Sequence, residues 1–296
     1  MKKSIFKGVA TALYTPFTDG KPDLSAFSEL IEWQISQKID AIVVLGTTGE
    51  SPTINDSERT EIIKTAVKQV RNRIPVIVGC GSNCTARFIE LTTRAKALGA
   101  DAALAVTPYY NKCNDDGLFR HYEAADKACG FPTIVYNVPS RTGFNIKPEV
   151  YAKLAQLDSV VGIKEACTDL IQIENDFVAA GDILPIYCGS DEMNFEFFKR
   201  GASGTISVLS NIIPLKIHDY FYDFERNYKV AKNRKDYIFE KLSKLLFTDV
   251  NPIPLKALAR KYNKKGCELR LPLTDLCENK KRKLYEEFDK LLKEID

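Results

Sequence analysis

Short apolar runs alternate along the chain with longer segments in which apolar residues recur at helical spacing. Continuous apolar runs of this length are typical of strands that are buried on both faces of a parallel sheet. The sequence therefore predicts strands over residues 9–14, 41–45, 75–79, 102–107, 133–138, 160–164, 184–188 and 204–208.

Helices are predicted between these strands. The clearest of them carries apolar residues at positions 24, 27, 30, 31 and 35, directly behind Asp23. Asp, Asn and Thr stand at several of the starts, where a side-chain oxygen can cap the first free N–H groups of a helix. The predicted starts lie near Asp23, Asn55, Thr85, Asp116, Lys147, Thr168, Asp191 and Asn211.

Alternation of strands and helices indicates parallel pairing through right-handed crossovers. Eight such units predict an α/β fold of the (β/α)8 (TIM) barrel type. An open doubly wound sheet stays an alternative, because periodicity does not show closure. Gly79-Cys80-Gly81 lacks the third glycine of a dinucleotide-binding loop. We divide the chain into a barrel domain, residues 1–225, and a C-terminal helical extension, residues 226–296, and expect helices over 212–247, 255–262 and 275–292.

Composition narrows the functional classes. A net charge of +3, from 42 basic and 39 acidic residues, is too small to favour nucleic acid or an anionic membrane. No apolar segment is long enough to cross a membrane, and no signal peptide follows Met1, so we expect a cytoplasmic protein. The eight cysteines form no CxxC pair and only two histidines are present, so we expect neither a metal site nor structural disulfides.

Lys164 is the first candidate for chemistry, because it follows directly on the buried run at 160–163. Lysine is almost never fully buried without a partner, since desolvating an ammonium is costly. The simpler interpretation is that the strand has ended and Lys164 points into solvent. The alternative is that partial burial lowers the pKa of the amine and makes it a nucleophile.

Other polar groups follow other strands, and the carboxyl ends of barrel strands form the active site in this fold. Thr47 and Thr48 lie between two glycines in a loop that can hold a carboxylate, or is an ordinary turn. Tyr136 and Arg141 follow the fifth strand and offer a proton donor and a bidentate carboxylate ligand, although Tyr136 can also be a buried ring with a satisfied hydroxyl. Together with Lys164 they favour Schiff-base chemistry on a keto acid. The residues alone leave the substrate open.

Several segments together resemble the signatures of the pyruvate-dependent class I aldolases, the family that includes N-acetylneuraminate lyase. They are GTTGE at 46–50, TPYYN at 107–111, YNVPSRTG at 136–143, GIKE at 162–165, GTISV at 204–208, NPIPLK at 251–256 and LPL at 271–273. The resemblance covers nearly the whole chain. Within the family it is greatest to the synthases that join pyruvate to L-aspartate 4-semialdehyde. It implies a (β/α)8 lyase, without a cofactor or metal, that makes 4-hydroxy-tetrahydrodipicolinate for lysine and diaminopimelate biosynthesis.

The resemblance also implies roles for the catalytic residues. Lys164 would form an imine with pyruvate, and Tyr136 would move protons to and from the intermediates. Thr47 would connect Tyr136 to Tyr110 in a proton relay. In the family the tyrosine at the position of Tyr110 reaches across from a neighbouring subunit, usually in a homotetramer built as a dimer of dimers.

The implied binding residues complete the site. Thr48 would hold the carboxylate of pyruvate, and Arg141 would bind that of the semialdehyde. Gly189 and Ile206 would provide main-chain contacts near the imine. The N-acetylneuraminate lyase branch stays an alternative, but its members typically lack an arginine at the position of Arg141. A non-catalytic barrel that binds a keto acid is a second alternative, although neither the lysine nor the tyrosine is lost.

One part of the family pattern is absent. Members that are inhibited by lysine bind it at a dimer interface, where this chain retains Ser51, Asn83 and Tyr109. The other matching positions are Pro52, Asp56, Arg59 and Arg87. A guanidinium in place of the family's glutamate repels the ammonium of lysine instead of binding it. We therefore expect weak lysine inhibition or none.

Overall fold

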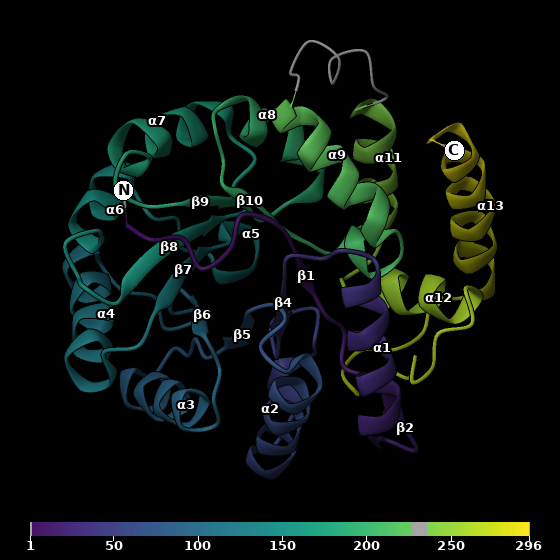
Figure 1. The fold of residues 1–296 in the computed structure, drawn as a ribbon, viewed down its shortest axis with the longest axis horizontal. Coiled ribbons are helices and arrows are strands. Elements are labelled where there is room, and N and C mark those ends of the chain that lie inside the picture. Colours follow the sequence, from purple (N-terminus) through teal and green to yellow (C-terminus); the bar gives the residue numbers. More distant parts are fainter. Residues whose placement is uncertain (1, 227–235, 296) are drawn as a thin grey trace.

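The computed structural model describes residues 2–226 and 236–295. A closed barrel of eight parallel strands lies at the centre of the described chain (Figure 1). The strands are β1 (Gly8–Ala12), β4 (Ala41–Val44), β5 (Val76–Gly79), β6 (Ala102–Val106), β7 (Thr133–Asn137), β8 (Val160–Glu165), β9 (Ile186–Cys188) and β10 (Gly204–Ser207). They neighbour one another in chain order, and β10 pairs with β1. The predicted (β/α)8 barrel is confirmed, and the open sheet is excluded.

The strands bury both faces, which explains their continuous apolar runs. Side chains on one face form a compact inner cluster that includes Ala10, Ile134 and Ile206. Side chains on the other face, such as Val9 and Ile163, join a larger cluster with the surrounding helices. Because successive strand residues point to opposite faces, every residue of a barrel strand meets apolar neighbours.

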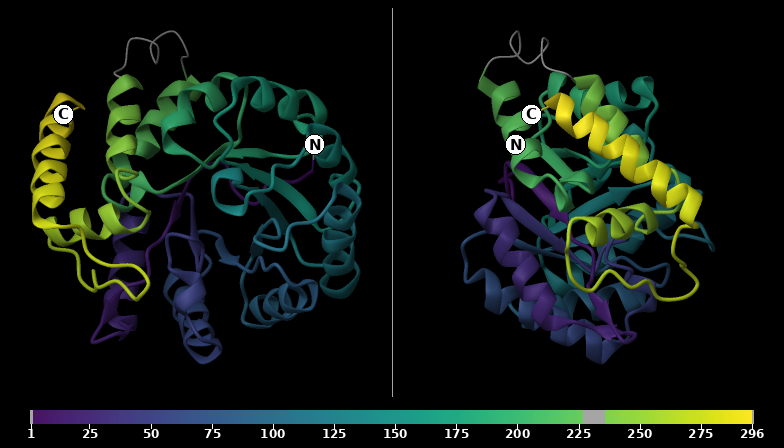
Figure 2. Two further views of the ribbon diagram at one scale, coloured as in Figure 1. Left: turned by 180° about the vertical axis from the view of Figure 1, so that it is seen from behind. Right: turned by 90° about the vertical axis from the view of Figure 1, so that its right-hand side faces the viewer.

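Helices surround the barrel, as Figures 1 and 2 show. Those that follow the strands are α1 (Leu24–Ser36), α2 (Asp56–Val70), α3 (Thr85–Ala97), α4 (Asp115–Cys129), α6 (Pro148–Leu154), α7 (Leu170–Ala180), α8 (Asn194–Lys199) and α9 (Pro214–Arg226). Two of the predicted cap residues act as expected: Asp23 accepts from the N–H of Ala26, and Asn55 and Glu58 form a capping box at the start of α2. At α3, α4 and α7 the N-cap is a nearby residue instead, namely Cys84, Asn114 and Asp169.

The tail is helical and lies along one side of the barrel. It contains α11 (Asp236–Leu245), α12 (Ile253–Lys261) and α13 (Glu278–Ile295), and α13 packs on both of the others (Figure 2). The helix predicted over 212–247 corresponds to α9 and α11, and residues 227–235 between them lie outside the described chain. The domain boundary at residues 225 and 226 stays a prediction.

Several short elements have no counterpart in the sequence-based prediction, among them two strands and a single helical turn. β2 (Phe17–Thr18) and β3 (Lys21–Pro22) form a small antiparallel pair outside the barrel. α5 (Pro139–Thr142) is a single turn directly after β7. Each is too short for periodicity to reveal it. In the part of the chain that the structure describes, no helix has the length and apolar character needed to cross a membrane.

Candidate active site

Lys164 and Tyr136 lie side by side at the carboxyl end of the barrel. Their Cα atoms are direct partners in the β7–β8 register, so the two side chains project from the same face of the sheet. The Nζ atom of Lys164 lies 4.3 Å from the centre of the Tyr136 ring. Both residues line a cavity of about 990 Å³. The two residues that sequence reasoning placed at the centre of the chemistry are therefore adjacent.

The environment of Lys164 favours a neutral amine. The residue is only 5% exposed, and burial lowers the pKa of the amine to about 8. The carboxylate of Asp191 acts in the opposite direction, while the guanidinium of Arg141 adds to the lowering. Asp191 is fixed in place, because its Oδ2 accepts from the N–H groups of Val208 and Leu209 at 2.7 and 2.9 Å. Near neutral pH roughly a tenth of such a lysine is the free amine, which is far more than at the pKa of an exposed lysine.

A pH dependence follows from this lowered pKa. Because the neutral amine attacks the carbonyl, the rate of imine formation with pyruvate should rise with pH and reach half its plateau near pH 8. Trapping with cyanoborohydride under excess pyruvate, followed by intact-protein mass spectrometry at several pH values, measures this rate. A half-maximal rate near pH 10, the value of an exposed lysine, would contradict the desolvated environment.

Tyr136 is held in its neutral form. Burial raises the pKa of its phenol to about 12, while the charge of Arg141 and a side-chain hydrogen bond from Thr47 act in the opposite direction. A neutral phenol beside an amine can donate a proton and take it back. Thr47 lines the same cavity, so the first two members of the predicted relay are in contact.

The predicted carboxylate ligands lie in the same cavity and are both held by Asn251. Thr48 is buried, and its Oγ1 accepts from Nδ2 of Asn251 at 3.0 Å. Arg141 lies on α5 and donates from Nη2 to the main-chain oxygen of Asn251 at 3.2 Å. The tail segment before α12 therefore positions both binding groups. Sequence reasoning did not assign Asn251 or Asp191 to the site, although the motif NPIPLK begins at Asn251.

The other predicted residues are placed differently. Gly189 lines the cavity. Ile206 is buried in the inner cluster of the barrel, which also contains Tyr136, and it is absent from the cavity lining. Tyr110 is 93% exposed and is absent from the cavity lining, so the chain by itself does not bring it to Lys164.

A buried ion pair connects the GTTGE loop to the tail. Nζ of Lys256 lies 2.5 Å from Oε1 of Glu50, and neither side chain has exposed surface. The ammonium also donates to the main-chain oxygens of Thr15 and Glu268, and the second oxygen of Glu50 accepts from the N–H of Arg270. Every strong hydrogen-bonding atom of the pair is thus satisfied, which a buried ion pair requires. Sequence reasoning missed this pair, because its members are distant in the chain.

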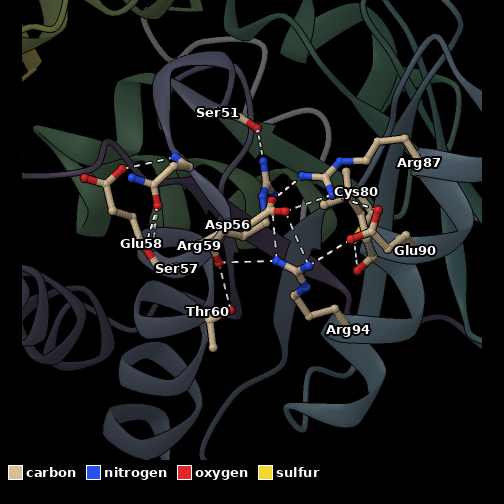
Figure 3. A network of polar contacts seen from close by, with 12 residues as sticks. Ser51, Asp56, Ser57, Glu58, Arg59, Thr60, Cys80, Arg87, Glu90 and Arg94 are labelled. Atoms are coloured by element: carbon tan, nitrogen blue, oxygen red, sulfur yellow. Dashed lines mark hydrogen bonds and ion pairs between the residues drawn. The ribbon is translucent and has the colours of Figure 1, made fainter.

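Three arginines and two carboxylates form a network between α2 and α3, beside the active site (Figure 3). Arg87 pairs with Asp56 and Glu90, and Arg94 pairs with the same two carboxylates. Arg59 donates only to the main-chain oxygen of Gly79 and to Oγ of Ser51. Asp56, Arg59 and Arg87 are among the positions at which the resemblance predicts lysine binding in lysine-inhibited members of the family, and here Asp56 is already paired with Arg87.

L-lysine should therefore leave the activity unchanged. An ammonium entering this region meets Arg59 and Arg87, while Asp56 and Glu90 are already engaged by arginines. We expect less than a twofold change of rate up to millimolar lysine, measured in a coupled assay at fixed ionic strength. Sodium chloride at equal concentration is the control, and half-inhibition at sub-millimolar lysine would contradict this expectation.

Comparison with known proteins gives one consistent result. The model of the dihydrodipicolinate synthetase family matches residues 5–293. The 4-hydroxy-tetrahydrodipicolinate synthase of Thermodesulfovibrio yellowstonii is 44% identical over 283 residues, which cover 95% of this chain and 97% of that protein. The corresponding enzyme of Alkaliphilus oremlandii is 42% identical over 286 residues, with coverage of 97% and 99%.

Solved structures of dihydrodipicolinate synthases are also similar to this chain. The crystal structure of dihydrodipicolinate synthase from Thermotoga maritima has a TM-score of 0.93 and 38% identity, and the match covers 97% of this chain and 99% of that one. The enzyme from Acinetobacter baumannii, solved in complex with pyruvate, has a TM-score of 0.93 and 37% identity over the same shares.

Proposed function

The chain belongs to the dihydrodipicolinate synthetase family, and we propose that its cavity condenses pyruvate with L-aspartate 4-semialdehyde through a Schiff base on Lys164. The product is 4-hydroxy-tetrahydrodipicolinate, a precursor of diaminopimelate and lysine. The chain is thus an enzyme of the carbon–carbon lyase class. The observation that carries the proposed mechanism is the buried amine of Lys164, with its lowered pKa, against the ring of Tyr136.

The first step joins Lys164 to pyruvate. The neutral amine attacks the keto carbon, and the resulting carbinolamine loses water to form an imine. In this proposal Tyr136, whose ring lies against the amine, donates the proton that the leaving hydroxyl needs. The positive imine then makes the methyl protons of pyruvate acidic, and loss of one gives a neutral enamine.

The enamine carbon forms the new bond. It attacks the aldehyde of the semialdehyde, whose oxygen takes up a proton as the imine is restored. The amino group of the second substrate then attacks the imine carbon, which closes the ring and releases the amine of Lys164. In this proposal Tyr136 both donates and accepts protons, and Thr47, which donates a hydrogen bond to its phenol, is the next member of the relay.

The loop after β4 and the turn after β7 bind the two substrate carboxylates in this proposal. Thr48 and the N–H groups of the glycine-flanked loop are suited to the carboxylate of pyruvate. The guanidinium of Arg141 is suited to the second carboxylate, because its two parallel N–H groups match the two oxygens. Both positions depend on Asn251, which donates to Thr48 and accepts from Arg141.

We further propose that the enzyme acts as a homo-oligomer, a dimer of dimers, in which Tyr110 completes the site of a neighbouring protomer. Tyr110 is 93% exposed and has a left-handed backbone (φ 68°), an uncommon conformation for a bulky residue, so the loop holds its side chain away from the rest of the chain. Its neighbour Tyr109 lines the cavity, so the loop stands at the cavity rim.

Mixing two inactive variants tests this arrangement. Tyr110→Phe and Lys164→Ala each lack one contribution, but a mixed dimer contains one site with both intact residues. Unfolding and refolding the mixture should restore up to about a quarter of the wild-type rate, while each variant alone stays inactive. Lys164→Ala mixed with Tyr136→Phe is the matched control, since both residues belong to one chain. Equal recovery in the two mixtures would contradict a shared site.

The second substrate is tested directly. Purified enzyme with pyruvate is offered L-aspartate 4-semialdehyde or N-acetylmannosamine, and consumption of each aldehyde is measured. We expect turnover of the semialdehyde alone, because Arg141 offers a ligand for its carboxylate. Turnover of N-acetylmannosamine would instead assign the N-acetylneuraminate lyase activity, and turnover of neither would favour a non-catalytic barrel that binds a keto acid.

We propose the cytoplasm as the site of action. All eight cysteines are free thiols, and Cys84 and Cys277 are exposed. Exposed thiols of this kind persist in a reducing compartment.

A further inference from the structure

Two buried carboxyl groups lie directly behind the lysine–tyrosine pair, on the outer face of the barrel. Glu165 follows Lys164 on β8, and its Cα partner Asn137 follows Tyr136 on β7. Because successive strand residues point to opposite faces, Glu165 and Asn137 project toward the helices, away from the cavity that the reacting pair lines. Glu165 has no exposed surface, and Asp176 of α7 is only 1% exposed. The proposed mechanism uses neither carboxyl.

Glu165 joins β7, α6 and the turn after β8. Its Oε1 accepts from the N–H of Cys167 at 2.6 Å, and its Oε2 accepts from the hydroxyl of Tyr151 at 2.7 Å. The side-chain amide of Asn137 donates to both oxygens, at 3.1 and 3.0 Å. Cys167 lines the cavity, and Asn137 is the residue after Tyr136. A displacement of this carboxylate would therefore shift the backbone beside both reacting groups.

Asp176 lacks a donor that a buried carboxylate needs. Its Oδ1 accepts from Nε2 of Gln172 at 2.9 Å, but its Oδ2 has no hydrogen-bond partner. The side chain lies within hydrogen-bond reach of Glu165, which is itself an acceptor. Two ionised carboxylates cannot hydrogen-bond to each other, and buried like charges at this range repel strongly. A proton on Oδ2 of Asp176 solves both problems, because it turns the unpartnered atom into a donor and leaves one negative charge on the two groups.

The surroundings hold this proton on Asp176. Burial and the charge of Glu165 both raise the pKa of Asp176 well above its usual range. Burial also raises the pKa of Glu165, but the hydrogen bonds from Tyr151 and Asn137 favour its ionised form. Glu165 is therefore the better acceptor and Asp176 the better donor.

Other titratable groups around the two carboxyls do not replace the proton. Burial raises the pKa of the Tyr151 phenol on α6 and of the Cys167 thiol after β8, so both are neutral near neutral pH. On β7, burial raises the pKa of Tyr136 to about 12. Asp169 caps α7 and accepts from the N–H groups at the start of that helix. Each of these groups is neutral or negative, so none supplies a positive charge to Glu165.

We propose that Asp176 donates a shared proton to Glu165, and that this acid pair positions Lys164 and Tyr136 for imine formation. Asp176 fixes Glu165, and Glu165 fixes Asn137 and the turn at Cys167. Neither carboxyl touches the substrate, so both are positioning residues. The effect on imine formation rests on the proposed function, whereas the shared proton does not.

The pH dependence of stability tests the shared proton. The unfolded chain loses the proton of Asp176 near pH 4, whereas the folded chain keeps it to higher pH, so this group costs the wild type stability as the pH rises. Asp176→Asn keeps a donor for Glu165 but has no proton to lose. The urea midpoint of this variant should therefore rise relative to that of the wild type from about pH 5 to about pH 7. Asp182→Asn, which removes an exposed carboxyl after α7, is the matched control, and its difference from the wild type should stay constant.

Asp176→Leu tests the positioning, because leucine has a similar volume but no donor. Rapid trapping of the pyruvate imine with cyanoborohydride separates two effects, since loss of folded enzyme lowers the amount of adduct, while misplaced groups lower the rate constant. We expect the rate constant at saturating pyruvate to fall at least about tenfold. The half-saturating pyruvate concentration should change by less than about twofold, because Thr48 lies on the distant loop after β4. Asp176→Asn should react within about twofold of the wild type, since its amide still donates to Glu165.

A second variant keeps the test decisive if Asp176→Leu does not fold. Tyr151→Phe removes another donor to Glu165 and should lower the same rate constant about threefold. Unchanged rate constants in the folded variants would overturn the positioning role. A stability difference of Asp176→Asn that does not grow with pH would overturn the shared proton. A wild-type enzyme that forms no pyruvate adduct would refute the proposed function instead, and the pH series would still decide where the proton lies.

Discussion

Replacing Lys164 by alanine should lower the turnover rate by roughly 10⁴-fold or more, because it removes the nucleophile that the protein supplies in the proposed mechanism. The pyruvate-dependent mass increase after borohydride treatment should disappear with it. Lys164→Arg is the sharper variant, since it keeps a positive charge and most of the volume but is always protonated and cannot attack a carbonyl. Both variants should retain the fold, because the side chain lines a cavity and no ion pair joins it to a carboxylate within 2–226 and 236–295.

The chain contains an internal control for this experiment. Lys256 is also a buried lysine, and burial lowers its pKa as well. It does not line the cavity, however, and Glu50 holds it as an ammonium. Peptide mapping of the reduced adduct should therefore find Lys164 and not Lys256. An adduct on Lys256, or one that survives in Lys164→Ala, would refute the assignment of the nucleophile.

The largest loss of stability is expected when the buried ion pair of Lys256 and Glu50 is broken. Lys256→Met leaves the carboxylate of Glu50 buried with no cation, and such a broken pair costs about 3–5 kcal/mol of the free energy of unfolding. Urea denaturation at fixed protein concentration, followed by circular dichroism, measures the change. Lys64→Met is the matched control, because Lys64 pairs with Glu61 at the surface, and it should change the stability by less than about 1 kcal/mol.

A second variant separates the charge from the packing. When Lys256→Met is combined with Glu50→Gln, neither of the two positions carries a charge. The double variant should therefore regain part of the stability lost by Lys256→Met. If the two single losses simply added, the two groups would not act as a pair. The activity of the double variant is also informative, since Glu50 directly follows the glycine-flanked loop that we propose binds pyruvate.

The barrel, and Lys164 and Tyr136 at the centre of the site, could be predicted from the sequence for a physical reason. Strands buried on both faces leave a continuous apolar signal in the chain, and Lys164 interrupts such a signal at its end. Its position after the fifth strand indicated Arg141 as a carboxylate ligand, but its assignment to the semialdehyde and the role of Tyr110 came from resemblance. The structure places Arg141 in the cavity, and for Tyr110 it shows only exposure.

The remaining features have no local signal. Asn251 and Lys256 act on residues about 200 positions earlier, and nothing in a periodic pattern reports such a contact. The strands β2 and β3 and the turn α5 are each only about one period long, so no repeat of the pattern can reveal them. Asp191 was visible as a helix start, but its influence on the amine of Lys164 depends on how the barrel closes.

The contacts of Asn251 and Lys256 with the loop after β4 have a consequence for synthesis on the ribosome. Thr48 and Glu50 leave the exit tunnel long before Asn251 and Lys256, which hold them in the finished protein. A nascent chain that has completed all of its strands therefore still lacks the contacts that fix the loop after β4. Competence to bind the keto acid should appear late and abruptly during translation, when the segment that begins at Asn251 emerges. An arrested chain that ends before that segment would contain all eight barrel strands, but its loop after β4 would not be held in the position that binds the keto acid.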